Sequence, residues 1–376
     1  MTTLRVIVDE MLSTAPGGVA RYTEELTREL IVTAPRGVSI DGIVAASTEP
    51  DYTRILERLP GLSVLHKSSL QRRELNAAWQ HGFTRLPGSG MVHAPSLFSP
   101  LARHDRLNDA DQIAVTVHDT IAWSHPDSLT PRAVAWHKAM AKRAQRYADA
   151  IVVPSHCVAD QFAQLFDVND RIRVISGAPS SALVLPVDAD LIASGLGLPE
   201  RYILAIGSLE PRRGIDQLIR ALPRVAGEVA LLIVGPDATD PALRAAVGES
   251  GIPAERVRAL GALSDPQLAV VISRASVFAY PNLEEGFGLP VLEAFALGTP
   301  VVHSDAPAII ELSADAGVVV ERGDEQGYAE RLADALTGVL DDAALAGRLR
   351  YSGLDRAGAF TWRGAAEKIW QLHADL

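Results

Sequence analysis

The sequence predicts an α/β fold made of two Rossmann-like, doubly wound parallel-sheet domains. At 376 residues the chain is too long for one ordinary hydrophobic core, so two domains are the expected arrangement. Short apolar runs rich in β-forming residues alternate with helical patterns, which favours parallel sheets covered by helices. The alternation begins again near residue 201, after a segment dense in Gly and Pro. We therefore expect an N-terminal domain over 1–178, a linker over 179–200 and a C-terminal domain over 201–359.

The first half contains three candidate strands, the apolar runs 4–8, 113–117 and 150–153. A loop that ends in Gly17-Gly18 follows the first run. Apolar residues then recur at three- and four-residue spacing, as on the buried face of a helix. The third run leads to Ser155, a residue type that is favoured at helix N-caps.

The second half repeats this pattern with candidate strands at 202–206, 229–234 and 275–280, and with a helix over 216–222. The last segment, 360–376, has the apolar stripe of an amphipathic helix. Open α/β sheets bind ligands at the carboxyl ends of their strands. We therefore expect the two sheets to face each other across a cleft, with the loops that follow their strands forming one site.

The most informative segment is 284–302, which reads EEGFGLPVLEAFALGTPVV. It follows a predicted strand, so its glycine loop leads from the carboxyl edge of a sheet into a helix. Pro290 suits the first helical position, and Gly298 marks the end of the helix. This arrangement places Glu285 in the loop and Glu293 in the first helical turn, where both can face one ligand bound at the free N–H groups.

This segment closely resembles the signature of retaining glycosyltransferases of family four, whose two nucleotide-binding-type domains form the GT-B arrangement. The resemblance implies that Glu285 reaches the donor sugar and that Glu293 accepts hydrogen bonds from the ribose hydroxyls. It also implies that 360–376 crosses back onto the first domain. Without the surrounding motif, each glutamate could equally be a solvated charge or a complement to the helix dipole. The residues of the loop itself, implied as donor-binding, are Gly286, Phe287, Gly288 and Leu289.

A pair of arginines, Arg212 and Arg213, lies in a loop that follows a predicted strand and precedes a helix. Guanidinium groups suit a diphosphate because they bind oxyanions in bidentate fashion and stay charged. The family commonly has Glu-Pro-Arg-Lys-Asn here, whereas this chain has Arg213 in place of Lys and Gly214 in place of Asn. The resemblance implies that both arginines contact the leaving diphosphate and stabilise it as the bond breaks.

Two further motifs of the first half resemble family features. Gly17 and Gly18 resemble the glycine loop that faces the diphosphate, since glycine permits a close backbone approach and positive φ. His118 and Asp119 follow a predicted strand and resemble the His-Asp pair near the anomeric end of the donor. Asp119 could orient either the imidazole or the acceptor. The alternatives are a plain turn at the glycines and a structural histidine at a strand end.

The charge distribution limits the partners. The net charge of −11 comes from the second half of the chain, which argues against nucleic acid. The stretch 54–106 is nonetheless basic and also contains Trp79 and Phe83. This pattern is typical either of a membrane-facing patch for a lipid-linked acceptor or of a solvated charged face. Its basic residues are Arg54, Arg58, Lys67, Arg72, Arg73, Arg85, Arg103 and Arg106.

Neither cysteine nor metal chemistry is indicated. Cys157 is the only cysteine, so we expect no internal disulfide and a reducing, cytoplasmic setting that could include the inner membrane face. No apolar run reaches the length of a membrane span, and the N-terminus begins directly with a predicted strand. Asp188 and Asp190 form an Asp-x-Asp pair in the predicted linker, where we interpret it as accidental. We expect no cofactor and no required metal.

The resemblance implies a retaining, metal-independent hexosyltransferase that uses a nucleotide-diphospho-sugar, with GDP-mannose as the favoured donor. The acceptor is expected to be a glycan, a lipid-linked sugar or a small molecule, as in polysaccharide biosynthesis. Two alternatives stay open at this point. One is a GT-B nucleotide-sugar epimerase, which would turn over the donor without an acceptor. The other is a non-catalytic nucleotide-sugar-binding module.

Overall fold

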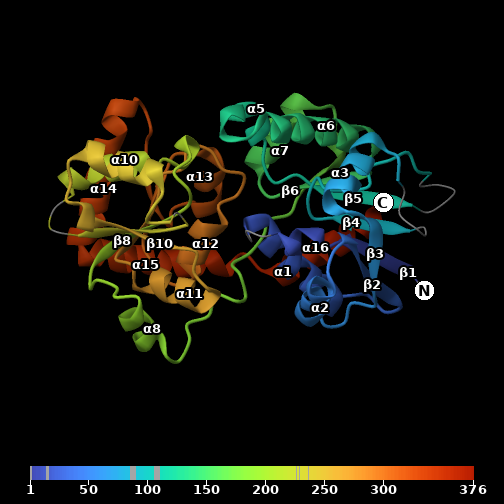
Figure 1. The fold of residues 1–376 in the computed structure, drawn as a ribbon, viewed down its shortest axis with the longest axis horizontal. Coiled ribbons are helices and arrows are strands. Elements are labelled where there is room, and N and C mark those ends of the chain that lie inside the picture. The colour runs from blue at the N-terminus through green and yellow to red at the C-terminus, as the bar shows by residue number, and fades with distance from the viewer. Residues whose placement is uncertain are drawn as a thin grey trace. The chain divides into compact units, whose positions relative to one another are not determined.

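The computed structural model describes the whole chain except Met1, 14–16, 85–89, 106–110, Ala226, Glu228 and Pro236, and except the side chains of 169, 325 and 326. It divides into two compact units, the first formed by Met1–Ala178 with Thr361–Leu376 and the second by Pro179–Phe360. Each unit is built on one sheet whose paired strands are all parallel, with helices on both faces (Figure 1). The predicted α/β class with two parallel-sheet domains is confirmed.

The first unit has a seven-stranded sheet in the order β3-β2-β1-β4-β5-β6-β7. Its strands are β1 (Thr2–Ile7), β2 (Val38–Ala46), β3 (Val64–Gln71), β4 (Met91–Ala94), β5 (Gln112–Thr116), β6 (Ala150–Val153) and β7 (Ile172–Val174). Its helices are α1 (Gly18–Val32), α2 (Glu49–Arg58), α3 (Arg72–His81), α5 (Ile121–Ser124), α6 (Pro131–Tyr147), α7 (His156–Leu165) and α16 (Trp362–Asp375), with short 3₁₀ turns at η1 (Asp9–Leu12), η2 (Pro126–Ser128) and η3 (Asn169–Arg171).

Alternating strand residues divide the first unit into two apolar layers. One face of the sheet packs against α3, α6 and α7, and the buried ring of Trp79 belongs to this layer. The opposite face is covered by α1 and α16, which also pack against each other (Figure 1). The indole Nε1 of Trp370 on α16 donates a 3.1 Å hydrogen bond to Thr33 Oγ1, just after α1.

The second unit has a six-stranded sheet in the order β10-β9-β8-β11-β12-β13. Its strands are β8 (Tyr202–Ile206), β9 (Ala230–Val234), β10 (Val257–Gly261), β11 (Val277–Tyr280), β12 (Val301–Ser304) and β13 (Val318–Val320). Its helices are α8 (Ala189–Gly195), α9 (Ile215–Ala221), α10 (Pro241–Ser250), α11 (Asp265–Arg274), α12 (Leu289–Ala296), α13 (Pro307–Ser313), α14 (Glu325–Asp341) and α15 (Ala343–Gly358), with 3₁₀ turns at η4 (Pro211–Arg213), η5 (Leu222–Arg224) and η6 (Ala254–Arg256).

The two faces of this second sheet also have separate cores. Tyr202 and Leu204 of β8 point to the layer of α11, α12 and α13. The alternate residues Ile203 and Ala205 point to the layer of α9, α10 and α14. Because β8 is buried on both faces, its sequence is continuously apolar, as expected for a central strand of a parallel sheet.

The segment 179–200 is more ordered than a simple linker, since it contains α8 and groups with the second unit. Asp190 lies on α8 and forms an ion pair with Arg274 of α11. No helix in the described part of the chain combines the length and the apolar character that crossing a bilayer requires.

A pair of buried histidines joins α16 to the sheet of the first unit. His93 of β4 and His373 of α16 lie edge to face, with ring centroids 5.8 Å apart. Both side chains are buried, and His373 Nδ1 lies 3.3 Å from Gln112 Oε1. Burial lowers the pKa of His93 well below its usual value and that of His373 to about 4. Both rings are therefore neutral at pH 7, so α16 packs onto the sheet without a buried charge.

We expect the first unit to lose stability as the pH falls from about 6.5 to 4, because the unfolded chain binds a proton at His373 that the folded chain rejects. The difference between 6.5 and about 4 corresponds to about 3 kcal/mol at this one residue. His373→Leu removes this proton uptake and should flatten the dependence, whereas the exposed His81→Gln should keep it. Urea unfolding at a series of pH values would give the slope of the unfolding free energy against pH for the wild-type protein and for each variant. Equal slopes in the wild-type protein and His373→Leu would contradict this account.

Candidate functional site

Two loops of the second unit meet at the carboxyl edge of its sheet. One follows β8 and contains Arg212 and Arg213, and the other follows β11 and contains Glu285. Because β8 and β11 are neighbours in the sheet, their loops leave the same edge side by side. The backbone N–H of Leu283 donates a 2.7 Å hydrogen bond to the carbonyl of Arg212, which ties the loops together.

Gly214 makes this contact possible. Its φ of +63° lies in the left-handed region, which L-residues with a side chain rarely adopt. A Cβ at this position would lie 2.4 Å from the carbonyl oxygen of Pro281. Glycine therefore satisfies both the turn and the close approach, at the position where the family motif commonly has Asn.

The carboxylate of Glu285 is held by three donors on one oxygen. Its Oε2 accepts hydrogen bonds from Tyr280 Oη at 2.7 Å, Asn282 Nδ2 at 3.0 Å and Arg213 Nη1 at 2.8 Å. Its Oε1 accepts a longer bond of 3.3 Å from the N–H of Gly286. The side chain is 18% exposed, so Glu285 is a fixed, half-buried carboxylate rather than a solvated loop charge.

Tyr280 is a dependable donor in this network. Burial raises the pKa of its phenol well above the usual value, and the negative charge of Glu285 raises it further. The phenol therefore keeps its proton at neutral pH and directs it at Glu285. Sequence analysis had treated Tyr280 only as the last residue of a strand, and no signal in the sequence singled it out.

Arg212 and Arg213 have different surroundings. Arg213 forms an ion pair with Glu285, whereas Nη2 of Arg212 lies 3.2 Å from Glu210 Oε2. The Arg212 side chain is only 10% exposed, and its Nε and Nη1 are buried without a hydrogen-bond acceptor among the described residues. Buried guanidinium donors without acceptors are costly. This geometry suits an anion that accepts from Nε and Nη1.

The helix that carries Glu293 begins at a glycine that no other residue can replace without a shift. Gly288 has φ +98°, and a Cβ on it would lie 2.4 Å from Cδ1 of Ile309. Pro290 occupies the first turn of α12, and Gly298 follows its end with φ +71°, as predicted. Glu293 is the fifth residue of α12, so it lies one position beyond the first turn in which we had placed it. Its side chain is buried, with 6% exposed.

The other loop residues have mixed orientations. Phe287 is buried and stacks edge to face on Phe360 with a centroid distance of 5.8 Å, so its ring belongs to the core of the second unit. Leu289 begins α12 and also packs against this core. Gly286 and Gly288 present only backbone. Any ligand contact by Phe287 therefore involves its backbone rather than its side chain.

In the first unit, His118 lies just beyond β5 at the carboxyl edge. Its Nε2 lies 2.7 Å from the carbonyl oxygen of Pro95, and Tyr22 packs edge to face on the ring at 4.8 Å. Burial lowers the pKa of His118, so the ring is neutral at pH 7. Because a carbonyl only accepts, Nε2 carries the hydrogen, and Nδ1 is left as an acceptor for a hydroxyl.

Asp119 and the two glycines have mainly structural contacts. Asp119 Oδ1 accepts from the N–H of Ile121 at 3.0 Å, where it helps start α5. Gly17 is the N-cap of α1 with φ −93°, and Gly18 is its first helical residue. The expected positive φ is therefore wrong for this loop, because the helix begins directly at the glycines. Pro16 lies outside the described residues.

A polar cluster that was not predicted from the sequence lies at the same edge of the first unit. Arg72 Nη2 donates to Glu10 Oε2 at 2.8 Å, and Nη1 of the same arginine contacts the buried carboxylate of Asp9. Ser96 Oγ donates to Glu10 Oε1 at 2.9 Å. The position of Asp9 and Glu10 directly after the first predicted strand could have indicated them as site residues. Arg72 follows β3, whose polar, half-exposed sequence VLHKSSLQ did not indicate a strand.

The basic stretch 54–106 offers fewer free charges than its sequence suggested. Trp79 is 1% exposed and fills the core, so it belongs neither to a membrane-facing patch nor to a solvated face, the two alternatives for this stretch. Phe83, by contrast, is 82% exposed. Arg85 and Arg106 lie outside the described residues. Among the described residues, several Lys and Arg side chains of the stretch are in ion pairs, namely Arg54 with Asp51, Arg58 with Glu24, Lys67 with Glu49, and Arg72 with Asp9 and Glu10.

Two family models match the chain, one in each unit. The model described as Glycosyltransferase Family 4 matches residues 16–178, and the model described as Glycosyl transferases group 1 matches residues 200–338. No group of three or more His, Cys, Asp or Glu side chains in the described ranges is arranged to hold a metal ion.

Sequence and structural similarity to known proteins extends over nearly the whole chain. The O-antigen chain mannosyltransferase B of Escherichia coli is 26% identical, with 92% of each chain covered. The D-inositol 3-phosphate glycosyltransferase of a Nocardioides strain is 25% identical, with 95% of this chain and 85% of that protein covered. Among solved structures, Anabaena Alr3699/HepE in complex with UDP and glucose superposes with a TM-score of 0.75 at 17% identity, with both chains fully covered.

We expect Gly214→Ala to destabilise the second unit more than a matched glycine substitution does. Gly251→Ala has a similar φ of +69° but open space around its Cβ, so it costs about 1–2 kcal/mol for the left-handed backbone alone. Gly214→Ala adds the clash with Pro281 and should cost a further 1–3 kcal/mol, roughly. Denaturant unfolding of both variants would measure the difference. Equal losses would show that the two loops can separate without cost.

Proposed function

We propose that this chain, which is a glycosyltransferase with the GT-B fold, moves a hexose from a nucleotide-diphospho-sugar to a glycan, lipid-linked or small-molecule acceptor. In this proposal the reaction retains the anomeric configuration and requires no metal. The observation that carries it is the buried guanidinium of Arg212, whose Nε and Nη1 lack acceptors at the carboxyl edge of β8. A diphosphate supplies the missing acceptors in bidentate geometry.

The second unit supplies the proposed donor contacts. Arg212 and Arg213 bind the diphosphate, Glu285 contacts the transferred hexose and Glu293 accepts from the ribose hydroxyls. The loop backbone through Gly286, Phe287, Gly288 and Leu289 approaches the donor. Glu285 is suited to this role because Tyr280, Asn282 and Arg213 fix its carboxylate and leave Oε1 with only a long bond to Gly286.

The first unit supplies the remaining proposed roles. His118 accepts a hydrogen bond from a hydroxyl at Nδ1, Gly17 and Gly18 approach the diphosphate with their backbone, and Asp119 serves the acceptor. The neutral ring of His118 supports the first of these roles, because an imidazolium has no acceptor nitrogen.

The surroundings of Glu285 support a reaction without a covalent enzyme intermediate. Oε2 accepts three hydrogen bonds, and Arg213 compensates the negative charge of the group. Because the two carboxylate oxygens share one delocalised charge, these contacts also weaken Oε1 as a nucleophile. We therefore propose that the bond from the anomeric carbon to the phosphate oxygen breaks as the acceptor oxygen attacks from the same face. The acceptor proton passes to the departing phosphate, whose growing charge Arg212 stabilises.

For the donor we propose GDP-mannose. The support is the mannosyltransferase named among the relatives, which covers 92% of this chain at 26% identity. The structural neighbour with UDP and glucose supports the fold alone at 17% identity, so UDP-glucose is the donor against which the proposal is tested. The stretch 54–106 keeps its proposed contact with a membrane-held acceptor, now through Phe83 and without Trp79.

The decisive experiment is a donor screen with product analysis. GDP-mannose, UDP-glucose and dTDP-rhamnose are offered with candidate acceptors, and NMR reports the anomeric configuration of the product. We expect turnover with GDP-mannose, an α-linked product and full activity in excess EDTA. Inversion, or activity lost in EDTA and restored by a divalent ion, would overturn the corresponding part of the proposal. Donor turnover without any acceptor would indicate an epimerase instead.

Arg212→Ala should lower the turnover number more than it weakens donor binding, because charge on the phosphate grows as the bond breaks. The expected loss is about a hundredfold or more, which corresponds to roughly 3–4 kcal/mol. Arg220→Ala is a matched control, since Arg220 is an exposed arginine of α9 that pairs with Asp216. Steady-state kinetics with saturating acceptor would compare the two. A rise in KM alone would show that Arg212 binds the donor but does not stabilise the departing phosphate.

A further inference from the structure

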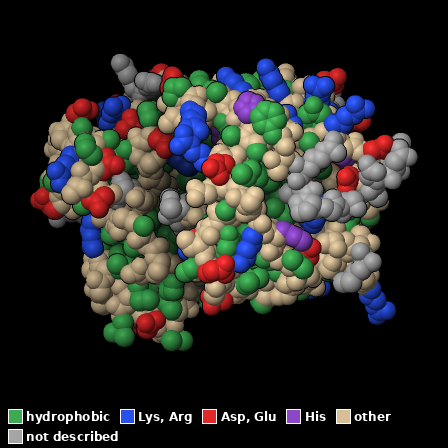
Figure 2. Space-filling model, turned by 45° about the vertical axis from the view of Figure 1, so that its right-hand side comes forward, with side chains coloured by type: hydrophobic (Ala, Val, Ile, Leu, Met, Phe, Trp, Pro, Cys, Tyr) green, Lys and Arg blue, Asp and Glu red, His purple; other side chains and the backbone are tan. Residues whose placement is uncertain are grey.

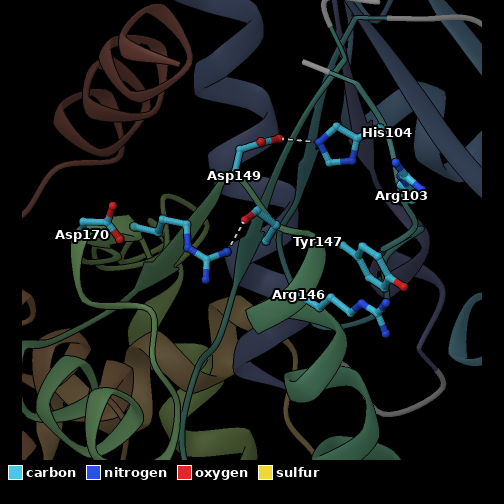
Figure 3. Close-up of a pocket in the computed structure, with 8 residues that line it drawn as sticks. Arg103, His104, Arg146, Tyr147, Asp149 and Asp170 are labelled. Carbon is cyan, nitrogen blue, oxygen red and sulfur yellow. Dashed lines mark hydrogen bonds and ion pairs between the residues drawn. The ribbon is translucent and has the colours of Figure 1, made fainter. Parts of the chain in front are cut away.

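A second cluster of cationic side chains lines a cavity of about 730 Å³ in the first unit. Figure 3 shows Arg103, Arg146 and the ring of Tyr147 on one side of this cavity and Asp170 at its far end. None of these residues belongs to the site described above. The chemistry of the cavity therefore needs its own explanation.

The cavity lies at the amino edge of the sheet, opposite to the edge that carries His118. Asp149 immediately precedes β6, and its N–H donates to the carbonyl of Ile113 at 2.9 Å, near the start of β5. From Gln112 to His118 the chain advances about 20 Å at the rise of a β-strand. A ligand in this cavity is thus too far from His118 to take part in a reaction there.

His104 is a cation in this cavity on geometric grounds. Its Nε2 lies 2.8 Å from Asp149 Oδ2, and its Nδ1 lies 3.0 Å from the carbonyl of Ala102. Both neighbours can only accept, so both ring nitrogens carry hydrogen. The carboxylate of Asp149 also accepts from the N–H of Ile113 at 2.8 Å. His104 and the N–H of Ile113 therefore compensate the negative charge of Asp149 within the wall of the cavity.

Arg171 removes a second source of negative potential. The carbonyl end of α6 points at the cavity and would repel an anion. The guanidinium of Arg171 donates to the carbonyls of Ala148 and Gln145 at 2.8 Å each, which compensates this end of the helix.

Arg103 and Arg146 are the cations of the cavity whose guanidinium N–H groups are available to a ligand. Both are exposed, and neither has an acidic partner among the described residues. The guanidinium of Arg146 lies 5.2 Å from the centre of the Tyr147 ring, which positions it beside an aromatic wall. Two guanidinium groups next to an aromatic face are a suitable receptor for an oxyanion attached to a carbon skeleton.

The surrounding surface favours the same kind of ligand. Helix α6 carries five basic residues and no acidic one in the sequence PRAVAWHKAMAKRAQRY. Figure 2 shows Lys and Arg side chains, together with some Asp and Glu side chains, along the upper edge of the molecule. A helix whose charged side chains all have one sign attracts ligands of the opposite sign and raises their local concentration.

From these observations we propose that the cavity at the amino edge of the first unit binds a phosphate ester, through bidentate contacts from Arg103 and Arg146, with its carbon skeleton against Tyr147. The phosphate belongs to a soluble metabolite or to a lipid headgroup, since both offer the same oxyanion. This site is separate from the proposed donor contacts and does not depend on them.

The test compares the double variant Arg103→Ala/Arg146→Ala with the control variant Lys138→Ala/Lys142→Ala. The control also removes two positive charges, but from residues of α6 that do not line the cavity. Calorimetric titration with glycerol 3-phosphate tests the soluble source, and sedimentation with phosphatidic acid vesicles tests the lipid source. Ionic strength is held constant with chloride. We expect one ligand to bind the wild-type protein and the control alike and to bind the cavity variant at least about tenfold more weakly.

Binding of the soluble ester assigns a metabolite site, and binding of vesicles alone assigns a headgroup site. Absence of binding to either ligand, or an equal loss in the control variant, overturns the proposal, because the effect would then belong to the basic helix as a whole. Arg103, Lys142 and Arg146 are exposed and Lys138 is half-buried, so circular dichroism should show an unchanged fold. Tyr147→Leu should weaken binding as well, which a purely electrostatic attraction would not produce.

Discussion

The close contact between the loops after β8 and β11 is the constraint on which the candidate site depends. Parallel neighbours in a sheet release their chains at the same edge, and Gly214 lets the first loop approach the Pro281 carbonyl of the second. That approach places Arg213 within hydrogen-bonding distance of Glu285. It also turns Arg212 in the other direction, toward Glu210. Two adjacent arginines thereby acquire different environments from a single turn.

The network around Glu285 explains how one carboxylate can be fixed and charged in a half-buried place. Tyr280 comes from the strand, Asn282 from the loop and Arg213 from the neighbouring loop, so the carboxylate links three chain segments. A buried charge is tolerated only when donors replace the water it loses. The same donors draw electron density from the oxygen, so the arrangement favours binding of hydroxyls over attack on carbon.

The predictable part of the molecule is the part dictated by local pattern. The buried strand 202–206, the N-cap Ser155 and the end of α12 at Gly298 follow from apolar periodicity and turn chemistry, and the structure places them as predicted. The contacts of Tyr280 and Arg72 were not predictable, because they depend on which strands are neighbours. Trp79 was misassigned for a related reason. A tryptophan among basic residues has the same sequence pattern whether its helix face meets the core or the solvent.

The order of the chain through the two units has a consequence for biosynthesis. The first unit is completed only by residues 361–376, which are made after the whole of the second unit. Until α16 arrives, one face of the first sheet is covered by α1 without its partner helix, and the ring of His93 has no His373 beside it. Domains generally fold as units in the order of their synthesis. Here the unit that begins first is the last to be finished, and the nascent chain carries a partly covered sheet face throughout the synthesis of the second unit.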